Sequence, residues 1–434
     1  MQPFDILAIL LTLAATFSWI NHRWLGLPTT IGLMAISLVM SLVLLMPLPG
    51  TDALEAEVRG MLNQLDLGVT LLHGVLSFLL FAGALHVSLR DLARQRWVIG
   101  ILASASVVGS TLLVGGGAYL VFGWLGLPVP LVYCLLFGAL ISPTDPIAVM
   151  GILKSAGAPE SLEIQIAGES LFNDGVTVVI FLALLQVATG AAEVSPGGLA
   201  VLFMREAIGG LVLGVAAGWV ALRMLASIDN YQVEVLITLA LAAGSYALAE
   251  QLGLSAPITV VVAGLMIGNT GRESVLSPRS TEHVDAFWGL VDEILNAVLF
   301  VHIGLEVMVI SLAGDYVLAG VLAIPLVLLA RALSVGLPIG IMRRFRSFSP
   351  GVVTLLTWGG LRGGVSVALA LSLPDGEPRD ILVSVTYVVV VFSILVQGLT
   401  LAPVIRAKAA QAEKELSRTR LPAEPAAPGA GTDA

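Results

Sequence analysis

The chain has 434 residues and a net charge of −9, and it combines 57% hydrophobic residues with only 12% charged ones. A soluble fold cannot bury that much apolar surface and still cover itself with polar groups. High hydrophobicity also excludes a disordered chain, the single Cys134 excludes a disulfide scaffold, and the negative charge excludes a nucleic-acid binder. We therefore predict an all-α polytopic membrane protein that contacts membrane lipid and has no nucleic-acid partner.

Apolar runs near the ~20 residues that a helix needs to span a bilayer follow one another along the chain. They lack the alternation of polar and apolar residues that is typical of membrane β-strands. The first run has no cleavage pattern, so we interpret it as a retained span rather than a signal peptide. In chain order we predict thirteen transmembrane helices, at residues 4–20, 28–48, 69–87, 98–125, 129–151, 164–188, 205–226, 232–250, 256–268, 286–310, 315–341, 350–373 and 380–405.

The basic residues predict how these spans are oriented. With the N-terminus outside, sixteen Lys and Arg residues fall in inward segments and three, Arg59, Arg205 and Arg379, in outward segments. Cytoplasmic loops carry such an excess, so we expect an N-terminus outside and a cytoplasmic C-terminus in a bacterial inner (plasma) membrane. Residues 407–434 are charged and then rich in Pro and Ala, which predicts a short disordered tail after a membrane domain of residues 1–406.

Ionisable residues within a span cost about 2.5–3.5 kcal/mol at the bilayer centre, so each predicts a function or a partner. In the fifth span, Asp145 lies in the sequence SPTDP at 142–146. Pro143 and Pro146 remove backbone donors and disfavour helical geometry at the residues before them. We predict an unwound stretch around Thr144 and Asp145 whose carbonyl, hydroxyl and carboxylate oxygens suit a hard monovalent cation.

The sixth span supplies a second polar group, ESLFNDG at 169–175. Ser170 and Asp174 are four residues apart and share one helical face, and Glu169 and Asn173 share the adjacent face. We predict that Asp174 carries the cation and the proton and that Ser170 is an oxygen ligand. Asn173 then supports the unwound stretch, and Glu169 pairs with an arginine.

Two arginines lie within spans. Arg362 is flanked by two glycines on each side, which weaken the helix and permit close approach of another backbone. Arg331 has an ordinary helical context and suits an ion pair with Glu169. For both arginines, pairing with an acid is favoured over contact with the transported ion.

The two interrupted spans occupy corresponding positions in the chain. Without the seventh span, a linker helix at about 205–226, six spans lie at about 1–190 and six at about 232–405, and the fifth of each set is interrupted. This pattern indicates a transporter binding site built from inverted six-helix repeats.

The stretches SPTDPIAV at 142–149, ESLFNDG at 169–175 and GGLRGG at 359–364 resemble the sodium/proton antiporters of the monovalent cation:proton antiporter family, of NhaP and NHE type. The resemblance covers residues 5–405. It implies a homodimer with a dimerisation domain and a mobile core domain that holds two crossed broken helices. By this resemblance the ion is bound by Asp145, Ser170, Asp174 and the Thr144 main chain, Asn173 bridges to Thr144, and Glu169 pairs with Arg331.

The expected activity is exchange of Na⁺ (or Li⁺) for H⁺ with no cofactor beyond the transported ions. A single carboxylate couples the two, because protonation of Asp174 releases the cation and cation binding releases the proton. One-for-one exchange then moves no net charge, and in related antiporters an Asn-Asp pair such as Asn173-Asp174 goes with electroneutral exchange.

Three alternatives to Na⁺/H⁺ exchange are weighed against the sequence, and one of them stays open. K⁺/H⁺ exchange on the same scaffold stays open, because selectivity depends on cavity geometry. A cation channel is a rival of another class, but it favours a polar stripe along several spans rather than polar groups at one depth. The five histidines are scattered without metal-ligand spacing, so we do not expect an enzyme.

Overall fold

The computed structural model describes residues 3–46, 58, 60, 74–190, 196–310, 313–346, 348–349 and 351–419, and all regular structure within these ranges is helical. Residues 69–73 of the predicted third span and residues 420–434 of the predicted tail lie outside the described residues. The elements are α1 (Pro3–Ile20), η1 (Asn21–Leu25), α2 (Thr29–Leu44), α5 (Leu76–Leu85), α6 (Leu89–Ala103), α7 (Ala105–Trp124), α8 (Leu131–Leu140), α9 (Pro146–Ala156), α10 (Glu160–Ala188), α11 (Pro196–Leu225), α12 (Tyr231–Gln251), α13 (Ala256–Met266), η3 (Ile267–Gly271), α14 (Arg272–Ser274), α15 (Pro278–Glu306), α16 (Gly314–Met342), α17 (Val352–Trp358), α18 (Gly364–Leu371), α19 (Glu377–Phe392), η4 (Ser393–Gln397) and α20 (Gly398–Thr419), where η marks a π-helical turn.

The apolar runs of the sequence form these helices. Among the described residues, eight helical segments are long and apolar enough to cross a membrane, and α2, α5 and α8 are shorter apolar helices. The described part of every predicted span coincides with a helix or with consecutive helices. The all-helical membrane fold is therefore confirmed, while the count of thirteen spans stays a prediction.

Local sequence determines where several helices begin. Asn230, Ser255 and Ser277 each accept a hydrogen bond from a first-turn amide of α12, α13 and α15, respectively. Proline follows early in α13 and α15, where its missing N–H would have had no helical partner in any case. The Ser277 cap fixes the start of α15, which borders the site described below.

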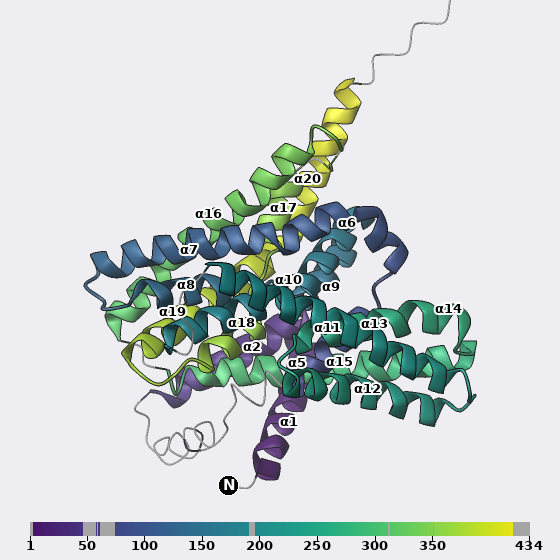
Figure 1. The fold of residues 1–434 in the computed structure, drawn as a ribbon. Helices are drawn as coiled ribbons and strands as arrows, with labels where there is room; N and C mark the ends of the chain where they lie inside the picture. The colour runs from purple at the N-terminus through teal and green to yellow at the C-terminus, as the bar shows by residue number, and fades with distance from the viewer. Residues whose placement is uncertain are drawn as a thin grey trace, which may run out of the picture.

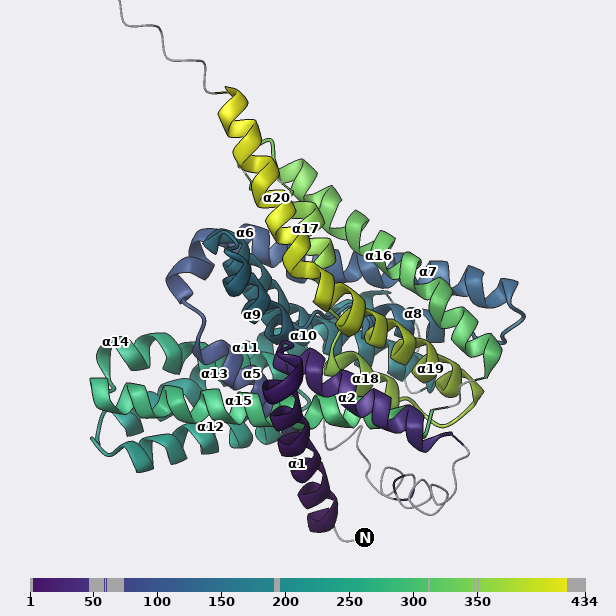
Figure 2. The same cartoon turned by 180° about the vertical axis from the view of Figure 1, so that it is seen from behind.

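The helices form two bundles. We call α1, α2, α5 and α11–α15 the scaffold bundle, and α6–α10 and α16–α20 the site bundle, because most helix pairs pack within these groups. In Figure 1, α11–α15 lie together at the lower right, and α7, α16, α17 and α20 lie above them; Figure 2 shows the same division from behind. The bundles meet where α10 packs on α5, α11 and α13, and where α15 packs on α18.

Two helices of the site bundle are broken. Residues 142–145 between α8 and α9 are not helical, and neither are residues 360–363 between α17 and α18. The first break contains Pro143 and is followed by Pro146, the first residue of α9. The second break contains the glycine-rich stretch around Arg362. The sequence predicted both breaks from these residues.

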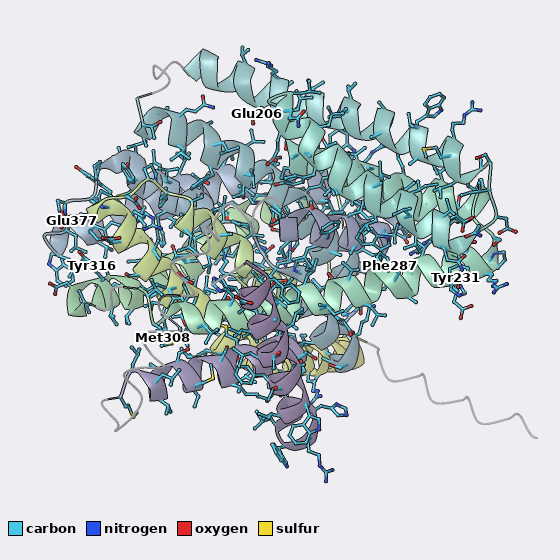
Figure 3. The ribbon with its side chains drawn as sticks, turned by 90° about the horizontal axis from the view of Figure 1, so that it is seen from below. Glu206, Tyr231, Phe287, Met308, Tyr316 and Glu377 are labelled. Atoms are coloured by element: carbon cyan, nitrogen blue, oxygen red, sulfur yellow. The ribbon has the colours of Figure 1, made fainter. Side chains whose placement is uncertain are left out.

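Residues from segments predicted on opposite faces of the membrane lie at opposite ends of the molecule, while the orientation itself stays a prediction. Figure 3 shows Tyr231, which precedes the predicted span 232–250 on the inward side, at one end of the molecule, and Glu377, from an outward-predicted loop, with Tyr316, from the outer end of the predicted span 315–341, at the other. One predicted boundary needs correction: α20 continues to Thr419, so residues 407–419 are helical rather than part of a disordered tail. This stretch is rich in Ala, Lys, Gln and Glu, which are strong helix formers despite their polarity.

Candidate functional site

The two breaks cross and bind each other. The amide of Asp145 donates to the carbonyl of Leu361 at 2.7 Å. A side chain at Gly363 would place its Cβ against the Asp145 carboxylate, so only glycine permits this approach. Backbone groups at membrane depth need such partners, and the crossing supplies them.

Arg362 holds the crossing together from inside. Its Nη1 donates to the carbonyls of Ser142 and Pro143, the latter at 3.0 Å, and its own amide donates to Ser393 Oγ at 2.8 Å. These carbonyls follow the C-terminal end of α8, where a positive charge is favourable. The sequence predicted an acidic partner for Arg362, but its side-chain hydrogen bonds go to main-chain carbonyls of the other break.

One face of α10 is bound to the first break. Asn173 donates from Nδ2 to Thr144 Oγ1 at 2.9 Å, and Thr144 Oγ1 lies 2.8 Å from Ser170 Oγ. All three side chains are at most 4% exposed. The unwound stretch is therefore fixed against α10 at the turn that carries Asp174.

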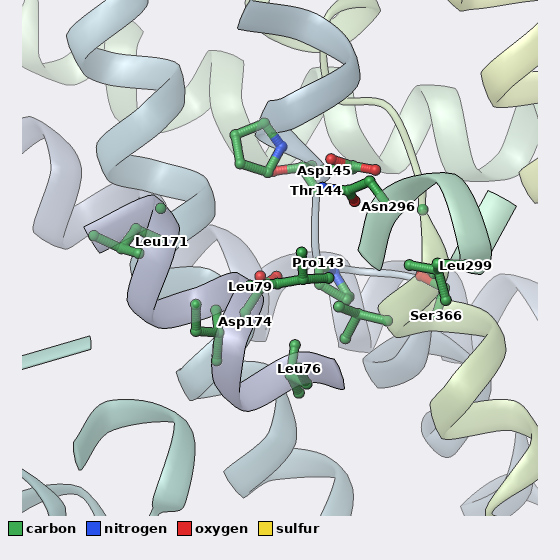
Figure 4. A pocket seen from close by; sticks show the side chains of 16 residues that line it. Leu76, Leu79, Pro143, Thr144, Asp145, Leu171, Asp174, Asn296, Leu299 and Ser366 are labelled. Atoms are coloured by element: carbon green, nitrogen blue, oxygen red, sulfur yellow. The ribbon is translucent and has the colours of Figure 1, made fainter. Parts of the chain in front are cut away.

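Asp174 faces a cavity of about 70 Å³ that it shares with Thr144 and Asp145. Figure 4 shows these side chains around the cavity, which α5, α15 and α18 also border. Asp174 is 6% exposed, and its Oδ1 has no hydrogen-bond partner among the described residues. Such a volume accommodates a small ion or a few waters, so the carboxylate has a cation or a proton as its available partners.

Glu169 lies on the adjacent face of α10 and forms an ion pair with Arg331 of α16, as the sequence predicted. Both side chains are nearly fully buried. Arg331 also donates from Nη2 to the carbonyl of Leu356 in α17 at 3.4 Å. The pair therefore joins α10, α16 and the helix before the second break.

Two larger cavities border the site from one end of the molecule. The Gly26 vestibule, about 550 Å³, is lined by residues 26–30 together with parts of α9 and α15. The His86 vestibule, about 510 Å³, is lined by His86, Lys154 and other residues of α5, α9, α10 and α15. These lining segments include or adjoin inward-predicted loops, so both vestibules lie toward the predicted cytoplasmic face.

Comparison with known proteins identifies the family. Residues 9–407 match the family described as "Sodium/hydrogen exchanger, transmembrane". The chain belongs to the sodium/hydrogen exchanger family. The Na⁺/H⁺ antiporter NhaP of Pseudomonas aeruginosa is 49% identical over 408 residues, which cover 93% of this chain and 96% of that protein. The Na⁺/H⁺ antiporter NhaH of Halobacillus dabanensis is 36% identical over 92% of this chain and 96% of its own length.

A solved structure supports the same fold. The sodium proton antiporter MjNhaP1 of Methanocaldococcus jannaschii matches with a TM-score of 0.72 at 20% sequence identity, covering 94% of this chain and 98% of that one. The arrangement of two bundles around crossed broken helices is thus the antiporter fold of the exchanger family.

The site of this exchanger brings together most of the residues chosen from its sequence. Thr144, Asp145, Ser170, Asn173 and Asp174 meet around or beside the cavity, and Glu169, Arg331 and Arg362 hold the elements that carry them. Sequence reasoning missed three residues near the site. Ser366 and Asn296 line the cavity, and Asp292 lies one helical turn before Asn296. For Asp292 a signal existed, because it is an acid within the predicted span 286–310.

Proposed function

We propose that this exchanger carries Na⁺ in one direction and H⁺ in the other, one for one and without net charge transfer, with Asp174 as the shared carrier. The observation that carries the proposal is the buried Asp174 carboxylate, which faces a small cavity and has an oxygen without a partner among the described residues. An ionised carboxylate in such a place needs a positive partner. Na⁺ and H⁺ each satisfy it, so the two ions exclude each other.

We assign the cation to oxygen ligands that line this cavity or, like Ser170, lie beside it. Asp145 and Asp174 provide carboxylates, Ser170 a hydroxyl and Thr144 a main-chain carbonyl. Arg362 already uses the carbonyls of Ser142 and Pro143, which is why Thr144 is the carbonyl assigned to the ion. A site made only of oxygens is suited to a hard cation.

The remaining predicted residues do not bind the ion but hold its ligands in place. Asn173 holds Thr144 in place, and its neutral amide adds no second titrating group, in agreement with one-for-one exchange. Glu169 and Arg331 neutralise each other, and Arg362 fixes the first break. Alternating access then follows when the site bundle moves against the scaffold bundle with the ion or the proton on Asp174.

We also propose the membrane organisation that the sequence predicts. It comprises thirteen spans in a membrane domain of residues 1–406, inverted repeats at about 1–190 and 232–405 around a linker helix, and a cytoplasmic C-terminus in a bacterial plasma membrane. The breaks support the repeats, since they lie in helices at corresponding positions. The proposed homodimer rests on the family resemblance of the sequence.

Ser170 provides a test of the ligand set. We expect Ser170→Ala to raise the KM for Na⁺ about tenfold, equivalent to about 1.4 kcal/mol of lost binding, and to change the maximal rate much less. KM is measured from sodium-driven proton movement in membrane vesicles. Ser106→Ala is the matched control, because Ser106 is equally buried but donates to the Ser334 carbonyl outside the cavity. An unchanged KM in Ser170→Ala would remove Ser170 from the ligand set.

The choice of cation is tested by adding each alkali cation to vesicles that hold a pH gradient. We expect Na⁺ and Li⁺ to dissipate the gradient and K⁺ to have little effect. Equal dissipation by K⁺ would favour the alternative of K⁺/H⁺ exchange on the same scaffold. Single-channel currents in bilayers containing the purified protein would favour the channel instead.

A further inference from the structure

The polar residues that line the site cavity are unevenly shared between the two bundles. Its polar lining comes from the site bundle, with Thr144, Asp145, Asp174 and Ser366. The scaffold bundle contributes the apolar residues of α5 and, from α15, Leu299 and Asn296. Among the described lining residues, Asn296 is the only polar side chain on the scaffold side.

The amide of Asn296 is oriented by its own helix. Its Nδ2 donates to the main-chain carbonyl of Asp292 at 2.8 Å and to Asp292 Oδ1 at 3.2 Å. Because both contacts use the NH₂ group, the carbonyl oxygen is directed away from Asp292. Asn296 is 4% exposed, and Figure 4 shows it reaching into the cavity on the side of Asp145 and Thr144.

Asn296 also lies between the cavity and the Gly26 vestibule, while the His86 vestibule shares Gly83, Pro146 and Leu171 with the cavity. Among the residues that the structure describes, Asn296 is the one that lines both the site cavity and the Gly26 vestibule. Asp292 lines both vestibules and is half-buried, next to the exposed Glu293. A cation that enters from this vestibule therefore meets the Asn296 carbonyl before it reaches Asp174.

We propose that Asn296 is a ligand of the transported cation, supplied by the scaffold bundle, and that Asp292 is the residue that positions it. This inference rests on the proposed function of Asp174. A neutral amide oxygen is a good ligand for a hard cation and adds no charge to the exchange. It completes the oxygen shell from the side that is otherwise apolar.

The proposal has a consequence for transport. Asn296 belongs to one bundle and the other ligands to the second bundle, so their distance changes when the bundles move. Asn296 binds the cation in the conformation that is open to the vestibules, and it is left behind when the site bundle turns to the opposite face. It therefore raises the affinity for Na⁺ on the cytoplasmic side only.

The test compares the two membrane faces. KM for Na⁺ is measured in everted vesicles, which present the cytoplasmic face, and in right-side-out vesicles. We expect Asn296→Leu to raise the KM about tenfold at the cytoplasmic face, as expected for one lost ligand, with little change at the outer face. Asn296→Ala carries the same prediction if the Leu variant does not fold. An unchanged cytoplasmic KM, or an equal rise at both faces, would overturn the proposal.

Variants of Asp292 test whether it orients the Asn296 amide or acts only through its negative charge. We expect Asp292→Ala, which removes the side-chain acceptor and keeps the main-chain one, to raise the cytoplasmic KM more than Asp292→Asn, which keeps a side-chain acceptor oxygen. Glu293→Gln is the control, because it removes a neighbouring charge of the vestibules without touching Asn296. If all three variants raised KM equally, Asp292 would act by its charge alone and the positioning role would be wrong.

A binding measurement separates this proposal from the proposed function. Na⁺ stabilises the folded protein according to its affinity, so purified Asn296→Leu should require about tenfold more Na⁺ than the unchanged protein for the same rise in unfolding temperature. Asp174→Asn is measured in parallel. Full exchange by Asp174→Asn would refute the carrier, whereas unchanged Na⁺ affinity of Asn296→Leu together with an inactive Asp174→Asn would refute only the role of Asn296.

Discussion

We expect Asp174→Asn to abolish sodium-driven proton movement in vesicles while the protein stays folded. The amide cannot exchange a proton at the pH of the assay, and it offers the cation no charge, so both halves of the cycle are lost. Folding is retained because the change removes a buried carboxyl whose Oδ1 has no hydrogen-bond partner among the described residues. Initial rates in vesicles, together with thermal unfolding of the purified protein, measure the two effects.

Asp380→Asn is the matched control for this prediction. Asp380 is exposed in the first turn of α19, far from the cavity lining, so its neutralisation should leave the rate unchanged. Retention of the full exchange rate by Asp174→Asn would contradict the carrier assignment.

The second large effect concerns stability. Glu169→Gln leaves Arg331 as an uncompensated buried charge between α10, α16 and α17, and Arg331→Met leaves Glu169 in the same position. We expect each single change to lower the free energy of unfolding by about 3–5 kcal/mol. The loss is measured by thermal or denaturant unfolding in detergent.

The exchanged pair distinguishes an ion pair from other causes of instability. Glu169→Arg combined with Arg331→Glu restores opposite charges, so the double variant should be more stable than either charge-reversed single variant. Recovery will be partial, since the Leu356 carbonyl loses its donor. A double variant that is no more stable than the singles would mean that the pair does not hold these helices together.

The helices and both breaks followed from local sequence. Span-length apolar runs leave a chain few options in a membrane, and Pro143, Pro146 and the glycines around Arg362 act on the backbone directly. The face shared by Ser170 and Asp174 is likewise a matter of helical spacing. These features are local, and local chemistry predicts them.

The long-range partners were harder to predict. Arg362 binds carbonyls more than 200 residues earlier in the chain. These carbonyls lack a helical partner because α8 has ended, and they come within reach of Arg362 only in the folded protein, where the two breaks cross. Asn296 carries no charge, so the cost of burying it gives no signal in the sequence. Its place at the cavity follows from how the scaffold bundle packs against the site bundle.

The most direct test of the central claim, that Na⁺ and H⁺ compete for one carboxylate, is the KM for Na⁺ as a function of pH. The purified exchanger is reconstituted in proteoliposomes with the membrane potential clamped. In the acidic limb we predict that KM rises about tenfold for each unit that the pH falls, as competition by mass action requires. We also predict that the rate does not respond to the clamped potential. A KM that is independent of pH, or a rate that follows the potential, would contradict the account.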